Sequence, residues 1–133
     1  MLSELEETTE RAGKKRAKLL ADIKREIEVH TRVEEEIFYP AFREAVDSKE
    51  DRKITLEAYE EHHVVDLVMP EIEGTDPSAE EFGAKAKVLK DLIEHHAEEE
   101  EKEMFPKARK LFERAELVEL GERIEARKAE LLG

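Results

Sequence analysis

The sequence predicts an all-α fold, and three observations support this prediction. Glycine and proline are scarce, with 5 Gly and 4 Pro in 133 residues, so the chain has few of the turn signals that β-hairpins need. Residues that favour helices, namely Glu, Lys, Ala, Leu and Arg, dominate the sequence. Apolar residues recur every three or four positions, as on one face of an amphipathic helix. We therefore expect a helical bundle that forms one domain over residues 1–133.

The first long helix is expected from about Lys14 to Val46. Its apolar positions step by three and four along one face and are Ala17, Leu20, Ile23, Ile27, Val33 and Ile37. Pro40 should kink this helix, because proline lacks a backbone donor and clashes with the preceding turn. Residues 1–12 are too few to form a stable helix by themselves.

The second helix is expected over residues 53–73, after a polar linker at 47–52. One side of this helix carries the apolar residues Ile54, Ala58, Val65, Val68, Met69 and Ile72. The segment Gly74–Pro77 should end it, since glycine and proline commonly follow the last turn of a helix.

The third helix is expected to begin near Ala79, with Ser78 as its N-cap and Glu81 completing a capping box. Pro106 interrupts it. The spacing of apolar residues remains helical beyond that point, so a C-terminal helix is expected to continue or restart over about 107–132.

Charge and cysteine content exclude several classes of function. The 23 Lys and Arg against 36 Asp and Glu give a net charge of −13, which disfavours binding to nucleic acid or to anionic membranes. No apolar run reaches about 18 residues and the N-terminus does not resemble a leader, so we expect a cytoplasmic protein. Because the chain has 0 Cys, any metal must be bound by His and carboxylate side chains.

The sequence contains a repeat at an offset of 66 residues. Both copies read His-x-x-x-Glu, then four residues, an aromatic residue and proline. The superposed pairs are Ile23 and Leu89, Ile27 and Ile93, His30 and His96, Glu34 and Glu100, Tyr39 and Phe105, and Pro40 and Pro106. Since His, aromatic residues and Pro are all uncommon in this chain, composition alone does not explain the match.

The repeat predicts a metal site. A His and a Glu four residues apart lie on one face of a helix, so both can reach the same ion. Both copies occupy the apolar stripe of their helix, where an unpaired ionised Glu would cost several kcal/mol and a divalent cation would compensate it. In the second helix His62 lies nearer the apolar stripe than His63 and is the expected ligand, with His63 as the alternative. Asp66, one turn further, is a weaker candidate.

The expected ligand set therefore has three imidazoles and two carboxylates: His30, Glu34, His62, His96 and Glu100. One ion could use all five, or two ions could share the carboxylates. Nitrogen and oxygen ligands without thiolate suit iron or manganese and also accept zinc. The sequence does not decide between these metals.

Three segments of the chain resemble the hemerythrin-like, or His-His-Glu (HHE) cation-binding, domain family. They are EVHTRVEEEIFYPAF at 28–42, EEHHVVDLVMPEI at 60–72 and EHHAEEEEKEMFPKAR at 94–109. The resemblance covers about residues 14–111 and implies an up-down helical bundle with a non-haem di-iron centre. It assigns His30 and Glu34 to the second helix of the family, His62 to the third, and His96 and Glu100 to the fourth, with both Glu bridging the irons.

The sequence departs from the family pattern at the first helix, because no His precedes His30. With that helix truncated, we expect a di-iron centre or an incomplete centre with one firmly bound iron. We also expect an exposed apolar groove, covered either by a second copy of the chain in a homodimer or by the helix over 107–132.

The remaining candidates have ordinary structural roles in this interpretation. His63 and His95 are expected to be exposed or to orient the ligands, and Tyr39 and Phe105 to pack in the core. A water-excluding pocket for a small ligand is expected to be lined by Ile27, Ile37, Phe38 and Val65.

The leading hypothesis is a non-haem iron protein that binds dioxygen or a related small oxidant for sensing, carriage or iron buffering, and is a binder rather than an enzyme. One alternative is a di-iron oxidoreductase acting on peroxide or nitric oxide. Another is a structural or interaction module whose metal only replaces a layer of the core. No Ser-His-Asp arrangement, phosphate loop or dinucleotide fingerprint is present.

Overall fold

The computed structural model describes residues 2–8 and 12–133, and within these residues it contains helices and no strands, which confirms the all-α prediction. Two of the helical segments, η2 and η3, are π-helical turns. The elements are α1 (Leu2–Glu7), α2 (Gly13–Val33), η2 (Glu34–Phe38), α3 (Tyr39–Ala45), α4 (Lys49–Glu73), α5 (Glu80–Glu99), η3 (Glu100–Met104), α6 (Phe105–Leu111) and α7 (Arg114–Leu132).

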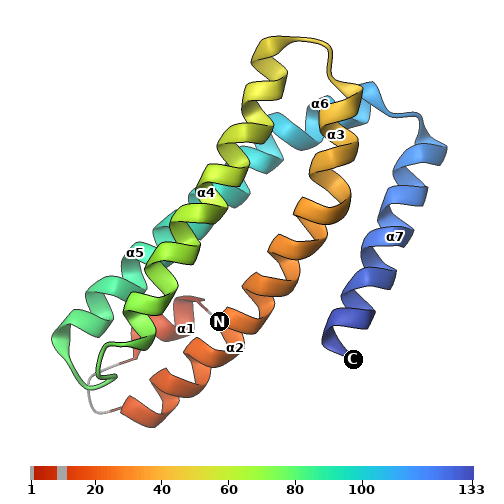
Figure 1. The fold of residues 1–133 in the computed structure, drawn as a ribbon. Helices are drawn as coiled ribbons and strands as arrows, with labels where there is room; N and C mark the ends of the chain where they lie inside the picture. The colour runs from red at the N-terminus through yellow and green to blue at the C-terminus, as the bar shows by residue number, and fades with distance from the viewer. Residues whose placement is uncertain (1, 9–11) are drawn as a thin grey trace.

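The described helices form four long rods that run alternately up and down (Figure 1). The rods are α2–η2–α3, α4, α5–η3–α6 and α7. The second rod packs along the third, and α7 lies against α2 and η2. The short α1 packs on α5 and α2 at the end of the bundle opposite α3 and α6. This arrangement leaves α2 flanked by α7 on one side and by only a short helix on another.

The short α1 forms although residues 1–12 are too few for an independent helix. Its Leu5 is only 2% exposed and joins the apolar core. Arg16 holds Thr8, directly after α1, because its guanidinium donates to the Thr8 carbonyl at 3.0 Å and to the Pro77 carbonyl at 2.8 Å. Tertiary contacts therefore stabilise a helix that propensity alone would not.

The predicted linker at 47–52 is mostly helical, so this expectation was wrong. The helix α4 begins at Lys49, four residues earlier than expected, because the Ser48 hydroxyl accepts a hydrogen bond from the Asp51 backbone N–H at 3.0 Å. This N-cap satisfies one of the free donors of the first turn.

The predicted N-cap of the third helix was also wrong. The Ser78 hydroxyl donates to an Asp76 carboxylate oxygen at 2.7 Å and is not used as a cap. The helix α5 instead begins at Glu80, after Ala79, without a side-chain cap. A capping box occurs instead at the start of α7, where the side chains of Glu113 and Glu116 each accept a hydrogen bond from the other residue's backbone N–H. It begins a new helix after Phe112.

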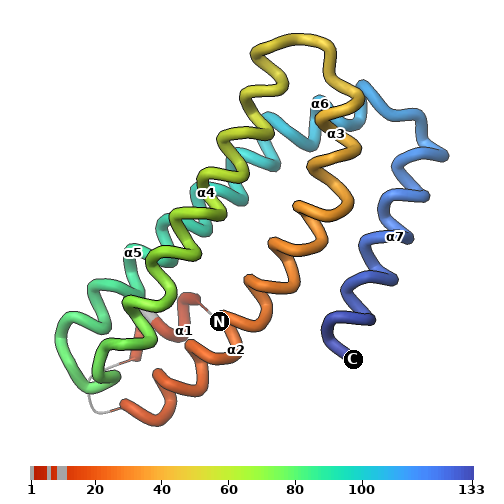
Figure 2. Tube along the Cα trace, in the orientation of Figure 1, coloured from red at the N-terminus to blue at the C-terminus, as the bar shows by residue number. Residues whose placement is uncertain are grey.

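Both repeat copies contain a π turn directly before the aromatic residue and proline. Figure 2 shows that the chain continues from α2 into α3, and from α5 into α6, without a break in the rod. In the first copy the Tyr39 backbone N–H donates to the carbonyl of Glu34, five residues earlier. In the second, Phe105 donates to Glu100 in the same way. The expected interruption at each proline therefore takes the form of a wider turn. Such turns are frequent at functional sites.

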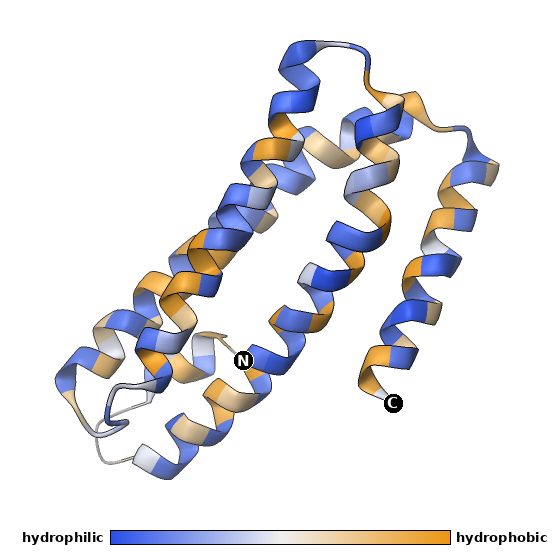
Figure 3. Ribbon diagram, in the orientation of Figure 1, coloured by the Kyte–Doolittle hydropathy of each residue, from blue (hydrophilic) through white to orange (hydrophobic). Residues whose placement is uncertain are grey.

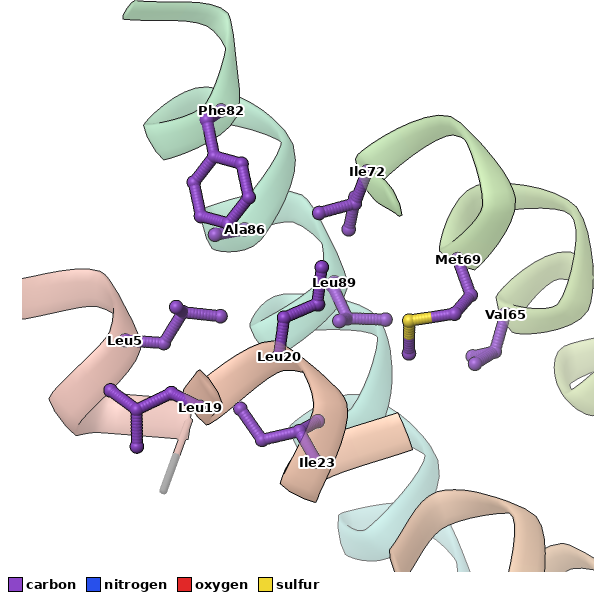
Figure 4. Close-up of a cluster of buried hydrophobic side chains, with 10 residues drawn as sticks. All are labelled: Leu5, Leu19, Leu20, Ile23, Val65, Met69, Ile72, Phe82, Ala86 and Leu89. Carbon is purple, nitrogen blue, oxygen red and sulfur yellow. The ribbon is translucent and has the colours of Figure 1, made fainter. Parts of the chain in front are cut away.

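Two apolar clusters fill the bundle. The lower core lies at the α1 end and contains Leu5, Leu19, Leu20, Ile23, Val65, Met69, Ile72, Phe82, Ala86 and Leu89 (Figure 4). The upper core lies at the α3 and α6 end and contains Tyr39, Phe42, Val46, Ala58, Met104 and Ala108. Figure 3 shows that α7 alternates hydrophobic and hydrophilic residues along its length.

Candidate metal centre

The structure brings together all five residues that the sequence predicts as ligands. His30 lies near the end of α2, and Glu34 and Glu100 are the first residues of η2 and η3. His62 lies in the middle of α4 and His96 near the end of α5. Four of the five side chains are buried, whereas His30 is exposed.

The ligand atoms converge on Glu34. Its Oε1 lies 2.9 Å from His30 Nε2, 3.3 Å from His62 Nε2 and 3.8 Å from His96 Nε2. On the other side, His96 Nε2 lies 2.6 Å from Glu100 Oε1. Glu34 therefore belongs to two possible ligand groups, one with His62 and His96 and one with His30 and Glu100.

The contacts of the imidazoles with Glu34 Oε1 lack hydrogen-bond geometry but have distances suitable for ligands of a shared metal ion. No N–H points at Glu34 Oε1 with hydrogen-bond geometry, and Oε2 of Glu100 also has no partner. The Nε2 atoms of His62 and His96 face each other at 3.1 Å. Two ligand atoms each about 2.1 Å from one ion stand roughly 3.0–3.4 Å apart, so this spacing fits a shared cation. The donor set of imidazole and carboxylate fits iron, manganese or zinc.

The two carboxylates differ in their electrostatics. Burial alone raises the pKa of Glu34, but contacts with the imidazoles of His30, His62 and His96 hold it well below its usual range. For Glu100, burial dominates and the nearby Glu34 adds to it, so its pKa rises to about 7 although His96 opposes the shift. Without a cation, the site therefore holds one firmly ionised carboxylate, Glu34, and one that is about half protonated near pH 7, Glu100.

Tyr39 is a functional candidate that the sequence interpretation missed, since we expected it only to pack. Its side chain is fully buried, and its hydroxyl lies 3.2 Å from His62 Nε2 and 3.1 Å from His96 Nε2. Burial and the nearby Glu34 and Glu100 raise its pKa. The sequence did contain a signal for this role. The second copy of the repeat has Phe105 at the equivalent position, so the two copies differ by the Tyr39 hydroxyl.

Two further carboxylates lie outside the imidazoles. Glu35 Oε1 is 3.4 Å from His62 Nδ1 but does not form a hydrogen bond with it. Glu61 Oε1 forms a hydrogen bond with His96 Nδ1 at 3.0 Å. Such partners fix the ring orientation of a metal-binding His and raise its basicity. In sequence, each of them is adjacent to an expected ligand within a run of Glu, which gave no reason to select it.

A groove of about 750 Å³ leads to the site. Ile27 and Val65 line it, as predicted, and so do His30, His62 and His96. The lower end is bordered by Leu2 of α1, and one edge by Lys128 and Leu132 of α7. The sequence led us to expect that a second copy of the chain or the C-terminal helix covers this face. The C-terminal helix, α7, contributes two residues to the border of the groove.

Two expectations about this groove were wrong. Ile37 and Phe38 do not line it: Ile37 is buried, and the Phe38 ring packs on Phe105 at 5.6 Å between ring centroids. His30 does not occupy a core position, because its side chain is 59% exposed at the groove. His30 is exposed because the groove opens beside it, between Leu2 of α1 and Lys128 and Leu132 of α7.

The comparisons with known proteins agree with this architecture. The family profile of the hemerythrin HHE cation binding domain matches residues 1–108 and ends before α7. A crystal structure of a hemerythrin HHE cation binding domain-containing protein from Mycobacterium kansasii is similar, with 27% identity and a TM-score of 0.82. That similarity covers 98% of this chain and 76% of the other. No curated protein matches the chain.

Within the described residues, no helix combines the length and apolar character that crossing a membrane requires.

Proposed function

Because this chain belongs to the hemerythrin HHE cation binding domain family, we propose that His30, Glu34, His62, His96 and Glu100 bind iron. The observation that carries the proposal is the convergence of three Nε2 atoms on one Glu34 oxygen, without a proton in hydrogen-bond geometry between them. A buried carboxylate in this environment needs a cation for compensation.

A centre for two irons is supported by the shared position of Glu34. One group of possible ligands holds Glu34 with His62 and His96, and the other holds Glu34 with His30 and Glu100. The first group is wholly buried, whereas the second includes the exposed His30. We expect the first group to bind its ion more firmly, because its side chains are buried and Glu61 orients His96.

We infer that the centre binds dioxygen or a related small oxidant, for sensing, carriage or iron buffering. When bound, iron with such ligands supplies redox chemistry and affinity for small oxidants. The groove supports access, because it reaches His30, His62 and His96 past the apolar Ile27, Val65 and Ile93. Its apolar lining would admit a small neutral molecule and exclude much of the water.

Anaerobic reconstitution with ferrous iron tests this function. We expect close to two irons per chain by elemental analysis, and a new absorption band when air is admitted. His62→Ala should lower the iron content, whereas His63→Ala, which changes the adjacent exposed residue, should leave it nearly unchanged. Equal losses in both variants would contradict the register of α4. Zinc bound without any response to oxygen would indicate a purely structural metal instead.

A second candidate function is an oxidoreductase that consumes peroxide or nitric oxide at the same centre. The open groove favours it, because His30 is 59% exposed there and a substrate could enter and a product leave. Iron-loaded protein should then consume peroxide with turnover, and His96→Ala should not. Stoichiometric oxidation without turnover would leave the binding function as the better description.

A further inference from the structure

A second cluster of possible ligands lies on the surface between α4 and α5. His95 Nε2 is 3.0 Å from Glu99 Oε1 and 3.8 Å from Glu61 Oε2. One ligand atom from each of the three residues lies within 4.8 Å of the others. The side chains of His95 and Glu99 are 64% and 40% exposed. The cluster is therefore open to solvent, unlike the buried centre.

Glu61 joins this surface cluster to the buried centre. Its Oε1 contacts His96 Nδ1 at 3.0 Å, while its Oε2 faces His95. One carboxylate thus touches a buried expected ligand with one oxygen and the surface cluster with the other. We describe Glu61, His95 and Glu99 together as the surface triad.

A small cavity lies between the surface triad and the centre. Its volume of about 10 Å³ has room for one water-sized guest. Glu61 and Glu99 line it from the triad, and His96 and Glu100 line it from the centre. Glu100 is 5% exposed, and its Oε2 has no hydrogen-bond partner. Glu100 is also an expected ligand of the buried centre, so this unsatisfied oxygen indicates that a cation is needed at the inner end of the cavity.

The side chains around the cavity carry negative charge, which also favours a cation. Glu57 and Glu103 also line it, so five Glu side chains surround a space with no Lys or Arg among its described lining residues. Apart from these Glu and His96, the lining is apolar. Such a concentration of one sign of charge raises the local concentration of counter-ions and the rate of their association.

We propose that the surface triad is an uptake site for divalent metal ions, which captures ferrous iron and passes it through the small cavity to the buried centre. The inference rests on the proposed iron-binding function. The groove remains the route for the small oxidant, so metal and oxidant reach the centre from different sides. Glu61 acts in both places, as a ligand in the triad and as the partner that orients His96.

Loading kinetics test the proposal. Metal-free protein is mixed with cobalt(II) or with anaerobic ferrous iron, and the rate at which the centre fills is followed by absorbance. We expect Glu99→Gln and His95→Ala to slow loading by about 10-fold, within the range of electrostatic steering. The final metal content should be unchanged, because neither residue belongs to the expected centre.

Matched controls distinguish the triad from general surface charge. Glu101→Gln removes one exposed negative charge from the same rod, and His63→Ala removes one exposed imidazole from α4. Both controls should load at the wild-type rate. Wild-type rates in both triad variants would overturn the proposal. If the wild-type protein bound no metal at all, the proposed function itself would fail, which is a different outcome.

A second measurement does not depend on the loading rate. With the centre filled with diamagnetic zinc, a small amount of Mn²⁺ is added and the imidazole signals are observed by NMR. Paramagnetic broadening should affect His95 and leave His63 sharp. Equal broadening of both rings would mean that Mn²⁺ has no preference for the triad, and would overturn the proposal.

Discussion

The two copies of the repeat share a local structure but have different environments. Each places His and Glu four residues apart, continues into a π turn and ends at an aromatic residue and proline. Yet the side chain of His30 is 59% exposed and that of His96 is 10% exposed. The carboxylates also differ, because the pKa of Glu34 is lowered and that of Glu100 is raised.

The difference arises from the neighbouring helices. His96 lies against α4, whose His62 is 3.1 Å away and whose Glu61 binds its other nitrogen. His30 faces the groove, whose described lining includes Leu2 of α1 and Lys128 and Leu132 of α7. The same sequence pattern therefore produces a buried half and an open half of one centre. We expect the buried half to determine affinity and the open half to determine access.

The largest expected effect is a difference in metal affinity between variants of His96 and of His30. His96→Ala should lower metal affinity by more than about 100-fold, beyond the usual loss for an outer partner, and His30→Ala by about 10-fold to 100-fold. Competition with a chelating indicator measures both affinities. Equal losses would show that exposure does not weaken the contribution of His30.

The carboxylates should differ in the stability of the metal-free protein. Glu34→Gln should destabilise by about 3 kcal/mol, because it removes the charge that three imidazoles contact. Glu100→Gln should cost less than about 1 kcal/mol, since the amide resembles the neutral carboxyl that burial favours. Urea unfolding of both variants checks the order. A larger cost for Glu100→Gln would reverse our assignment of the ionised carboxylate.

Metal binding to the buried half of the centre should release a proton from His96. Burial alone lowers the pKa of His96, but Glu100 and Glu34 raise it to about 11. Because this folded-state pKa exceeds the ordinary value of 6.5, the bound proton stabilises the metal-free fold below pH 6.5, and this stability is lost as pH rises toward 11. Metal must displace that proton. At pH 7 we expect about one proton from His96 per bound ion, measured with a pH indicator in weak buffer; no acidification would contradict it.

The smallest effect concerns the aromatic positions. Tyr39→Phe should destabilise the metal-free protein by about 1 kcal/mol, because it removes the hydroxyl that contacts His62 and His96. Phe105→Tyr, the reciprocal change in the other copy, should cost less than about 0.5 kcal/mol, since the Phe105 side chain is only partly buried. Thermal unfolding of the two variants compares them. Equal shifts would mean that the Tyr39 hydroxyl has no special role.

The sequence by itself determined the helices and the identity of the expected ligands. Helical periodicity identified the apolar faces, and the offset of 66 residues paired His30 with His96 and Glu34 with Glu100. These features are local, because they depend on spacing along one helix. The choice of His62 over His63 followed from the same geometry, and the structure places His62 in the buried group.

Only the tertiary structure decided what surrounds each ligand. The exposure of His30, the contact of the Tyr39 hydroxyl with two imidazoles, and the double contact of Glu61 all depend on neighbouring helices. The short α1 likewise forms only because Leu5 packs into the lower core. Burial and electrostatics depend on which elements meet in space, and two identical patterns in one chain acquire different properties when different helices cover them.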